Sequence, residues 1–445
     1  MYRFPEGVYS DVRVEWHESA SVGLKNNEML YNNEVSSVGA MIRVYDGKMW
    51  YTCVVNDLQE VQTQLDELAA LAEKNDDILN DPTVKNFEVN KAAILKYDKE
   101  NDNRKVSRSA RERLVRGYNQ RCSDSSIEEI KTVNVSYSQE HMVKQFYSSK
   151  GACIEQDHQE CNFHMGFEVI VDGVTTYARK SYTGDSFDMM KDKDDEIIAA
   201  RNRYIDYAHN AVDVEPGDYV CVLAPVVTAM FTHESFGHKS EADFMLNDKT
   251  LRDEWEMGKK VGSDLVSICD SGDMPNHGYL AFDDEGTAAR PTWLIKKGVL
   301  SGRLHDAKSA AVLGEELTGN SRAQDFHYMP MVRMTNTYML GGDTSFSDMI
   351  KDIKDGIYVY DVNYGTGNST FTMQPSLCYR IRDGKICEPV RANVVTGSVF
   401  KTLFDIDALG DDYTLFDTFM CGKNGQGIRV SAGGPTIRVK SLTVN

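Results

Sequence analysis

The chain has 445 residues, a length that corresponds to two or three domains of ordinary size. Hydrophobic residues make up 41% and charged residues 26%, which excludes a disordered chain and a small disulfide-stapled scaffold. The net charge of −19 repels phosphate backbones, so nucleic acid is not expected as a partner. No apolar stretch reaches the roughly 18–20 residues of a membrane-spanning helix, so no membrane partner is expected either.

The start of the chain and the cysteines bear on the cellular compartment. Residues 1–18 lack the basic patch and apolar run of a signal peptide. The nine cysteines are an odd number, and no two are spaced as C-x-x-C. We therefore expect reduced thiols and a cytoplasmic location.

The first half of the chain alternates between strand and helix patterns. Strands are predicted where apolar and polar residues alternate, at 12–18, 40–55, 131–138 and 164–180. Tight turns are expected at Asp46-Gly47 and Asp172-Gly173, because these dipeptides tolerate a positive φ. Apolar residues at three- and four-residue steps predict helices at 58–71 and 188–210. An Arg-rich helical pattern at 104–121 is interpreted as a solvated surface helix.

The second half of the chain is rich in short strands. After a break at 215–219, a buried-strand pattern at 219–225 leads into a predicted helix over 226–246. Turns are expected later at Lys297-Gly298, Asp383-Gly384 and Gly433-Gly434. The sequence thus predicts an α+β fold with mixed or antiparallel sheets and flanking helices. We expect two domains, an N-terminal α+β domain at 1–212 and a C-terminal, strand-rich domain at 213–445 that holds the metal site.

One motif in the predicted helix has the chemistry of a metal site. His233, Glu234 and His238 form H-E-x-x-x-H, and imidazoles with a neighbouring carboxylate are the groups that metal-assisted hydrolysis requires. In an ideal helix, however, two residues five positions apart point about 140° away from each other. Gly237 offers a way to loosen or bulge that turn, whereas a regular helix would instead align Glu234, His238 and Glu241. The alternative is a pair of partly buried histidines that only form hydrogen bonds.

A zinc site needs a third protein ligand, and three kinds of candidate remain open. Glu241 is close in sequence, although it suits the role of a partner that orients a histidine. Another histidine could come from elsewhere in the chain. Cys421 lies in the glycine-rich stretch 419–427, where Lys423 or a metal would favour its thiolate; otherwise it is a small buried apolar residue.

Other motifs are less informative. Asp283, Asp284 and Glu285 could bind a hard cation, but we interpret them as a solvated turn. The chain contains no dinucleotide-binding fingerprint, no phosphate-binding loop and no G-x-S-x-G.

Seven segments together resemble the TldD/PmbA family, an older label for which is modulator of DNA gyrase. They occur in the family's order and span most of the chain: HESFGHKSEADF (233–244), FDDEGTAAR (282–290), TGNSRAQ (318–324), PMVRMTNTYM (330–339), GIYV (356–359), CGKNGQG (421–427) and GGPT (433–436). Because the H-E-x-x-x-H residues are all present, the chain is most similar to the TldD-type, catalytic branch.

The resemblance implies a zinc-dependent peptidase that hydrolyses unfolded or extended peptides. It implies Zn²⁺ held by His233, His238 and Cys421, with Glu234 as the general base. It also implies a homodimer, or a heterodimer with a PmbA (TldE)-type subunit, and a substrate chamber to which the N-terminal domain contributes.

Two other functions remain open on the sequence. One is a non-catalytic, regulatory or peptide-binding subunit of a TldD/PmbA-type complex. The other is a thiol hydrolase in which Cys421 is the nucleophile and a histidine is its base.

Overall fold

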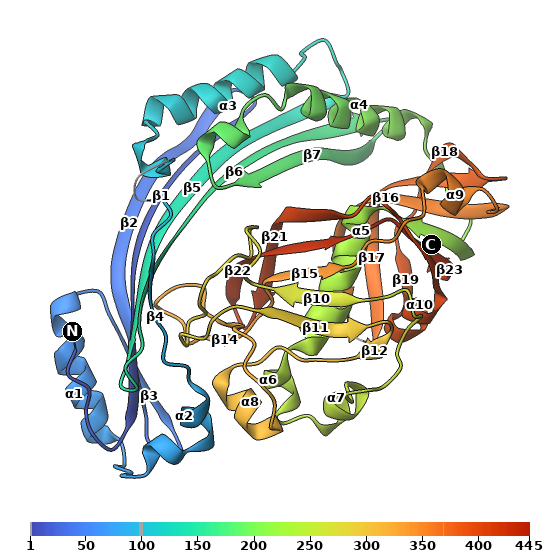
Figure 1. The fold of residues 1–445 in the computed structure, drawn as a ribbon. Coiled ribbons are helices and arrows are strands. Elements are labelled where there is room, and N and C mark those ends of the chain that lie inside the picture. Colours follow the sequence, from blue (N-terminus) through green and yellow to red (C-terminus); the bar gives the residue numbers. More distant parts are fainter. Residues whose placement is uncertain (1, 98–100, 368) are drawn as a thin grey trace.

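The computed structural model describes residues 2–97, 101–367 and 369–445, which fold into the α+β architecture that the sequence predicts (Figure 1). One long, curved sheet comes from the N-terminal part of the chain and arches around the C-terminal part. We propose the division between domains at residues 212 and 213, because the last helix that covers the curved sheet ends at Asn210.

The curved sheet has seven strands in the order β3-β2-β1-β5-β6-β4, with β7 paired to β6. They are β1 (Tyr9–Lys25), β2 (Glu28–Tyr45), β3 (Trp50–Val55), β4 (Lys91–Ile94), β5 (Ile130–Ser148), β6 (Cys153–Val171) and β7 (Val174–Gly184). The predicted turns at 46–47 and 172–173 are confirmed, and several strands extend well beyond their predicted ranges. The turn between β1 and β2 was missed; it uses Asn26 and Asn27, both with positive φ.

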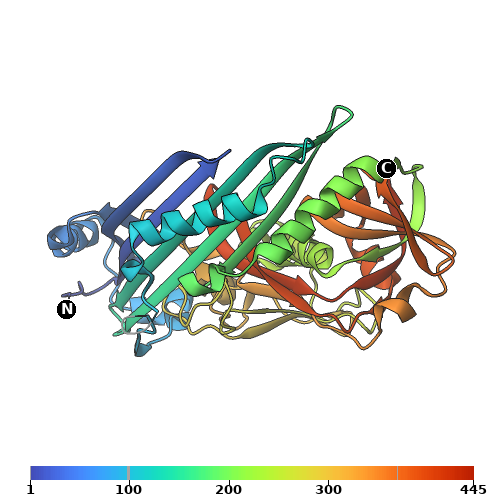
Figure 2. The ribbon, with the colours of Figure 1, turned by 90° about the horizontal axis from the view of Figure 1, so that it is seen from above.

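Four helices accompany the curved sheet: α1 (Val61–Leu71), α2 (Pro82–Asn86), α3 (Arg108–Cys122) and α4 (Asp194–Asn210). Seen from above, α3 and α4 lie across the strands on the outer face (Figure 2). Alternate residues of β6, such as Phe163 and Phe167, are buried beneath these helices. The predicted surface helix is confirmed for α3, which exposes Arg108, Arg113 and Arg121 to solvent and buries Val115 and Tyr118 against the sheet.

The C-terminal part contains two larger sheets and one short strand pair. A six-stranded sheet is formed, in spatial order, by β12 (Val299–Leu300), β11 (Pro291–Lys296), β10 (Ile268–Ser271), β15 (Asn336–Met339), β22 (Gln426–Gly434) and β21 (Thr414–Lys423). An eight-stranded sheet contains β8 (Val212–Asp213), β9 (Gly217–Leu223), β16 (Asp355–Gly367), β17 (Thr370–Arg382), β18 (Lys385–Arg391), β19 (Val395–Ser398), β20 (Ile406–Leu409) and β23 (Ile437–Val444). The pair is β13 (Ser321–Arg322) with β14 (Met331–Val332).

Helix α5 (Pro225–Thr232) lies between the two larger sheets and packs against strands of both. Its buried Val227 and Phe231 belong to the largest apolar core. The shorter helices of this half are α6 (Ala242–Met245), α7 (Lys249–Glu254), α8 (Ala307–Leu313), α9 (Phe346–Ile350) and α10 (Val399–Asp405). No helix in the described ranges is both long and apolar enough to span a bilayer.

Two of the three turns expected in this half are confirmed, at 297–298 and 383–384. The turn expected at Gly433-Gly434 is wrong, because both residues lie within β22 and are fully enclosed. A Cβ atom on Gly434 would lie 2.6 Å from the Cγ2 of Thr228 in α5, and one on Gly433 would lie 2.7 Å from the Leu415 side chain. These glycines therefore allow α5 and β21 to approach the strand closely.

The acidic run at 283–285 joins the two halves of the molecule, so its interpretation as a solvated turn is wrong. Asp284 forms an ion pair with Lys144 on the curved sheet, and the Nε of Arg13 lies 3.9 Å from its carboxylate. Glu285 contacts the guanidinium of Arg43 at 3.2 Å. All of these side chains are buried or nearly so, and each acid is compensated by a base from the other half.

Replacement of Asp284 by Asn should destabilise the protein, because removal of one partner of a buried ion pair leaves the other charge uncompensated. We expect a loss of about 3–5 kcal/mol in the free energy of unfolding, measured by denaturant titration. The control is Glu73→Gln, which breaks the exposed Lys48–Glu73 pair and should leave the midpoint unchanged. Equal midpoints for both variants would contradict a stabilising role for the buried contact.

Candidate metal centre

The two motif histidines lie on a turn that is wider than that of an α-helix. Helix α5 ends at Thr232, and residues His233–Gly237 form a single π-helical turn. The backbone N–H of His238 donates to the carbonyl of His233, five residues earlier, and a short 3-10 turn follows. The helix predicted over 226–246 is therefore interrupted, and the bulge that the sequence allowed at Gly237 is present as this π-helical turn. The extra residue in this turn brings the two imidazoles toward one another, with ring centroids 5.2 Å apart.

Gly237 permits this turn because of the space beside it. Its backbone has φ −57°, which any residue can adopt, so positive φ is not the reason for glycine here. A Cβ atom at this position would lie only 1.8 Å from the Sδ of Met334, a fully buried residue. The turn is thus pressed against the core at a point where no side chain fits.

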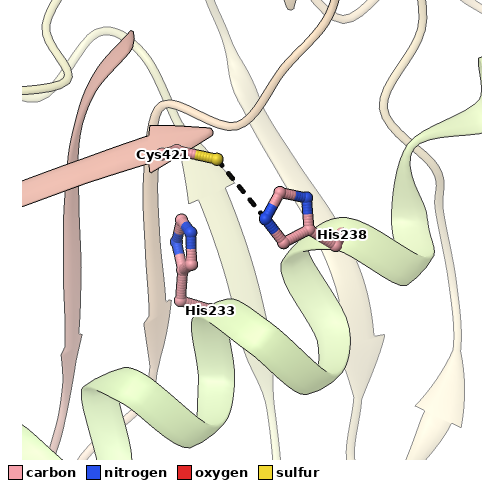
Figure 3. Close-up of side chains that lie close together, drawn as sticks. All are labelled: His233, His238 and Cys421. Atoms are coloured by element: carbon pink, nitrogen blue, oxygen red, sulfur yellow. Dashed lines mark hydrogen bonds between the residues drawn. The ribbon is translucent and has the colours of Figure 1, made fainter. Parts of the chain in front are cut away.

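The third candidate ligand reaches the same point from a distant part of the sequence. Cys421 lies near the end of β21, and its Sγ is 3.4 Å from the Nε2 of His238. Donor atoms of His233, His238 and Cys421 all lie within 4.8 Å of one another (Figure 3). Figure 3 shows both imidazoles and the sulfur directed toward a common space between the strand and the turn.

This donor set fits zinc. Tetrahedral zinc with bonds of about 2.0–2.1 Å to nitrogen and about 2.3 Å to sulfur places those donors roughly 3.6 Å apart, close to the observed 3.4 Å. The Nδ1 of His233 is buried and has no hydrogen-bond partner among the described residues, as expected of an atom whose partner is an ion. Among the residues that the structure describes, this is the one group of three or more potential ligands that is close enough to share an ion.

The electrostatics of the three groups favour a thiolate. Burial opposes the charged sulfur, but hydrogen bonds and positive charge from His233 and His238 lower the pKa of Cys421 to about 5. Burial also opposes a charged imidazole, yet hydrogen bonds to Cys421 and Glu241 raise the pKa of His238 to about 10. The deprotonated sulfur that a metal requires is therefore stabilised by the protein around it.

Glu234 lies beside this group without being one of the three. Burial raises the pKa of its carboxyl, and the charges of His233 and His238 oppose that rise. No hydrogen bond links its carboxylate to another residue within 2–97, 101–367 or 369–445. A carboxylate in this position, with a raised proton affinity and free lone pairs, can accept a proton from a water molecule nearby.

Glu241 lies where the sequence analysis suggested, in contact with a histidine. Its Oε2 is 3.2 Å from the Nδ1 of His238, which leaves Nε2 of that ring directed at the Cys421 sulfur. The same carboxylate oxygen also contacts the ammonium of Lys423 at 3.2 Å. The expectation that Lys423 acts on the thiol is not what the structure shows, because its ammonium is engaged by Glu241, Asp243 and a backbone carbonyl.

Two contacts of the site were not found from the sequence. Met334 fills the space beside Gly237, and Phe419 stacks on His233 with ring centroids 6.3 Å apart. Lys423 was named in the sequence analysis, and because residues two apart on a strand share a face, Cys421 and Lys423 point the same way. No local pattern could reveal Met334, which comes from a segment almost a hundred residues away.

Two family models match the chain. The model described as PmbA/TldA metallopeptidase C-terminal domain covers residues 216–445, and the model described as PmbA/TldA metallopeptidase domain 1 covers residues 10–76.

Several curated relatives are similar over most of the chain. A metalloprotease of Synechocystis sp. is 31% identical over 98% of this chain and 94% of its own length. A metalloprotease of Methanocaldococcus jannaschii is 30% identical over 97% of this chain and 96% of its own. The zinc metalloprotease TldD homolog of Saccharolobus solfataricus is 32% identical over 71% of each chain.

Solved structures share the fold. A putative modulator of a DNA gyrase from Thermotoga maritima superposes with a TM-score of 0.78, at 17% identity, over 99% of this chain and 96% of its own. TldE from Thermococcus kodakarensis gives a TM-score of 0.74, at 15% identity, over 98% and 96%. One family model covers residues 216–445, and two curated relatives are at least 30% identical over nearly the whole chain. On this evidence the chain belongs to the PmbA/TldD family of metallopeptidases.

Proposed function

We propose that the protein is a zinc-dependent peptidase that hydrolyses unfolded or extended peptides. In this proposal His233, His238 and Cys421 hold Zn²⁺, Glu234 is the general base, and Glu241 orients His238. The observation that carries it is the convergence of two imidazoles and a thiol, from segments more than 180 residues apart, within 4.8 Å. Three protein ligands of the histidine and cysteine type are the donor set of catalytic zinc sites.

Zinc held by these three ligands would supply Lewis-acid chemistry at an open fourth position, lowering the pKa of a water molecule there and polarising the scissile carbonyl. Glu234 takes a proton from the attacking water and then passes it to the leaving amine. The raised pKa of the Glu234 carboxyl supports this role, because a base that returns its proton must bind it well.

The edge of β21 is suited to an extended peptide. β21 is the last strand of its sheet and pairs only with β22 among the described strands, so its outer edge has unpaired backbone groups. Cys421 belongs to this strand, and a peptide that adds to the edge passes beside the metal centre. Main-chain pairing of this kind tolerates many side chains.

A cavity of about 550 Å³ supports a substrate chamber between the two halves of the molecule. His17 and Glu140 line it from the curved sheet, and Met420 and Arg429 line it from the β21–β22 hairpin. Met420 is paired with Arg429 across the hairpin and points to the face of β21 opposite Cys421, so the cavity lies on the other side of the strand that carries the sulfur. We further propose that the protein assembles as a homodimer or with a PmbA (TldE)-type subunit, in which a second chain would complete this enclosure.

A second candidate function is favoured by the Cys421–His238 contact. A thiol with a lowered pKa, 3.4 Å from an imidazole, is also the arrangement of a cysteine nucleophile and its base. The thiol-hydrolase hypothesis assigns no role to the Nδ1 of His233, which is buried without a hydrogen-bond partner among the described residues. For this reason we favour the zinc peptidase.

The metal content of the purified protein tests the proposed ligands directly. Purified wild-type protein should contain about one zinc per chain by atomic emission, and Cys421→Ser should contain much less, because a hydroxyl is a far weaker zinc ligand than a thiolate. Removal of the zinc with a chelator should stop peptide hydrolysis, and zinc add-back should restore it. Full activity in the metal-free protein, together with inactivation by an alkylating agent, would instead establish the thiol hydrolase.

Replacement of Glu234 by Gln should leave zinc content unchanged and reduce kcat for an unfolded protein substrate by about 10²–10⁴-fold, the usual contribution of a general base. The control is Glu256→Gln, an exposed glutamate just beyond α7, which should retain full activity. Equal rates for wild type and Glu234→Gln would contradict the assigned role. No cleavage by any variant, with zinc present, would favour the non-catalytic subunit.

Replacement of Gly237 by Ala should disturb the π-helical turn, because its new methyl group meets Met334. Overpacking of this kind costs about 1–3 kcal/mol. We expect a lower melting temperature and weaker zinc retention during dialysis. The double variant Gly237→Ala/Met334→Ala removes the obstruction and should recover zinc retention relative to the single variant. An additive loss in the double variant would show that the turn does not depend on this contact.

A further inference from the structure

One buried lysine links the two segments that carry the candidate ligands. Lys423 lies two residues after Cys421 on β21, so its side chain leaves the strand on the same face as the sulfur. It is only 7% exposed. An ammonium group this far from water requires partners for its charge and for its three N–H donors.

The acidic partners of Lys423 come from the chain just after the histidine turn, and its carbonyl partner comes from β14. Its Nζ contacts both carboxylate oxygens of Asp243, at 2.8 and 2.7 Å, and donates to the carbonyl of Val332 at 2.9 Å. The same nitrogen lies 3.2 Å from Oε2 of Glu241 and 4.0 Å from the centroid of the Phe244 ring. The ammonium group of Lys423 therefore links the β21–β22 hairpin, which carries the sulfur, to the segment just after His238.

Lys423 also contacts the buried carboxylate of Glu241. Its carboxylate has no exposed surface, and its Oε1 has no hydrogen-bond partner among the described residues. Its Oε2 lies between Lys423 and the Nδ1 of His238, 3.2 Å from each. Lys423 and His238 are thus equally near this oxygen, and Lys423 is the one of the two that is not a proposed metal ligand.

We propose that Lys423 is a positioning residue of the metal centre: through Glu241 it sets the orientation of the His238 ring, and through its own strand it sets the position of Cys421. The inference rests on the proposed ligand set and deepens it. Without the ammonium, Glu241 loses one of the two groups that hold its Oε2 and can turn away from His238. The ring can then rotate, and the hairpin is no longer fastened to the histidine turn.

The matched control is Lys239, the residue that follows His238. It is also a buried lysine, 8% exposed, and it also pairs with a carboxylate, at 2.7 Å. Its partner is Glu254 in α7, so this pair has no link to Glu241. Lys239→Met therefore removes a comparable buried ion pair from the same segment without touching the proposed chain of contacts.

The experiment measures zinc affinity by competition with a chromophoric chelator, and the absorption spectrum of the cobalt-substituted protein, in five forms of the full chain. These are wild type, Lys423→Met, Lys423→Arg, Glu241→Gln and Lys239→Met. Loss of a residue that orients a metal ligand typically weakens metal binding about 10–100-fold. We expect that loss in Lys423→Met and Glu241→Gln, with altered cobalt bands, partial recovery in Lys423→Arg, and wild-type values in Lys239→Met.

The double variant Lys423→Met/Glu241→Gln separates positioning from general destabilisation. It removes the fully buried Glu241 charge together with the ammonium, so the one carboxylate left without this partner is Asp243, which water still reaches, and folding should recover in part. Since both residues act through one contact, its zinc affinity should be no weaker than that of either single variant. Additive losses, or equal losses in Lys423→Met and Lys239→Met, would overturn the proposal. If wild type itself binds no zinc and gives no thiolate–cobalt band, the proposed function fails instead.

Discussion

The metal centre depends on one backbone hydrogen bond, from the N–H of His238 to the carbonyl of His233. In an α-helix this donor would bond four residues back, and the two imidazoles would point to different sides. The five-residue bond adds one residue to the turn and places both rings beside the sulfur. Such π-helical turns are rare inside α-helices and are frequent at functional sites. Here the irregular turn gives the two histidine side chains a direction that a regular helix would not.

Strand β21 lies opposite the histidine turn and supplies the other side chains of the site. On β21 the alternation of side chains places Cys421 and Lys423 on one face, so one strand supplies both a sulfur and an ammonium to the same neighbourhood. The histidine turn supplies the two rings and the acid that contacts the lysine. The geometry of the centre therefore depends on the register between two segments far apart in sequence.

Most secondary structure was predictable because its causes are local. The turns at 46–47 and 172–173 follow from residues that accept a positive φ, and helices at 61–71 and 194–210 follow from their apolar stripes. Gly433 and Gly434 resemble a turn by composition, but their function is to admit α5, a tertiary contact that no local pattern encodes. At the site, the sequence identified the candidate ligands and the possibility of a bulged turn at Gly237. The sequence could not identify the contact between Met334 and Gly237, because that contact results from the packing of the whole core.

The buried ionic contact between the curved sheet and residues 284–285 also constrains how this protein can change over time. A charge reversal at Asp284 is tolerable only if Lys144 and Arg13 change with it, and the same holds for Glu285 with Arg43. A substitution on one side of this contact therefore requires a matching substitution on the other side. A chimera that joins the N-terminal half of one relative to the C-terminal half of another would be stable only if the buried charges of the two halves are complementary at this contact.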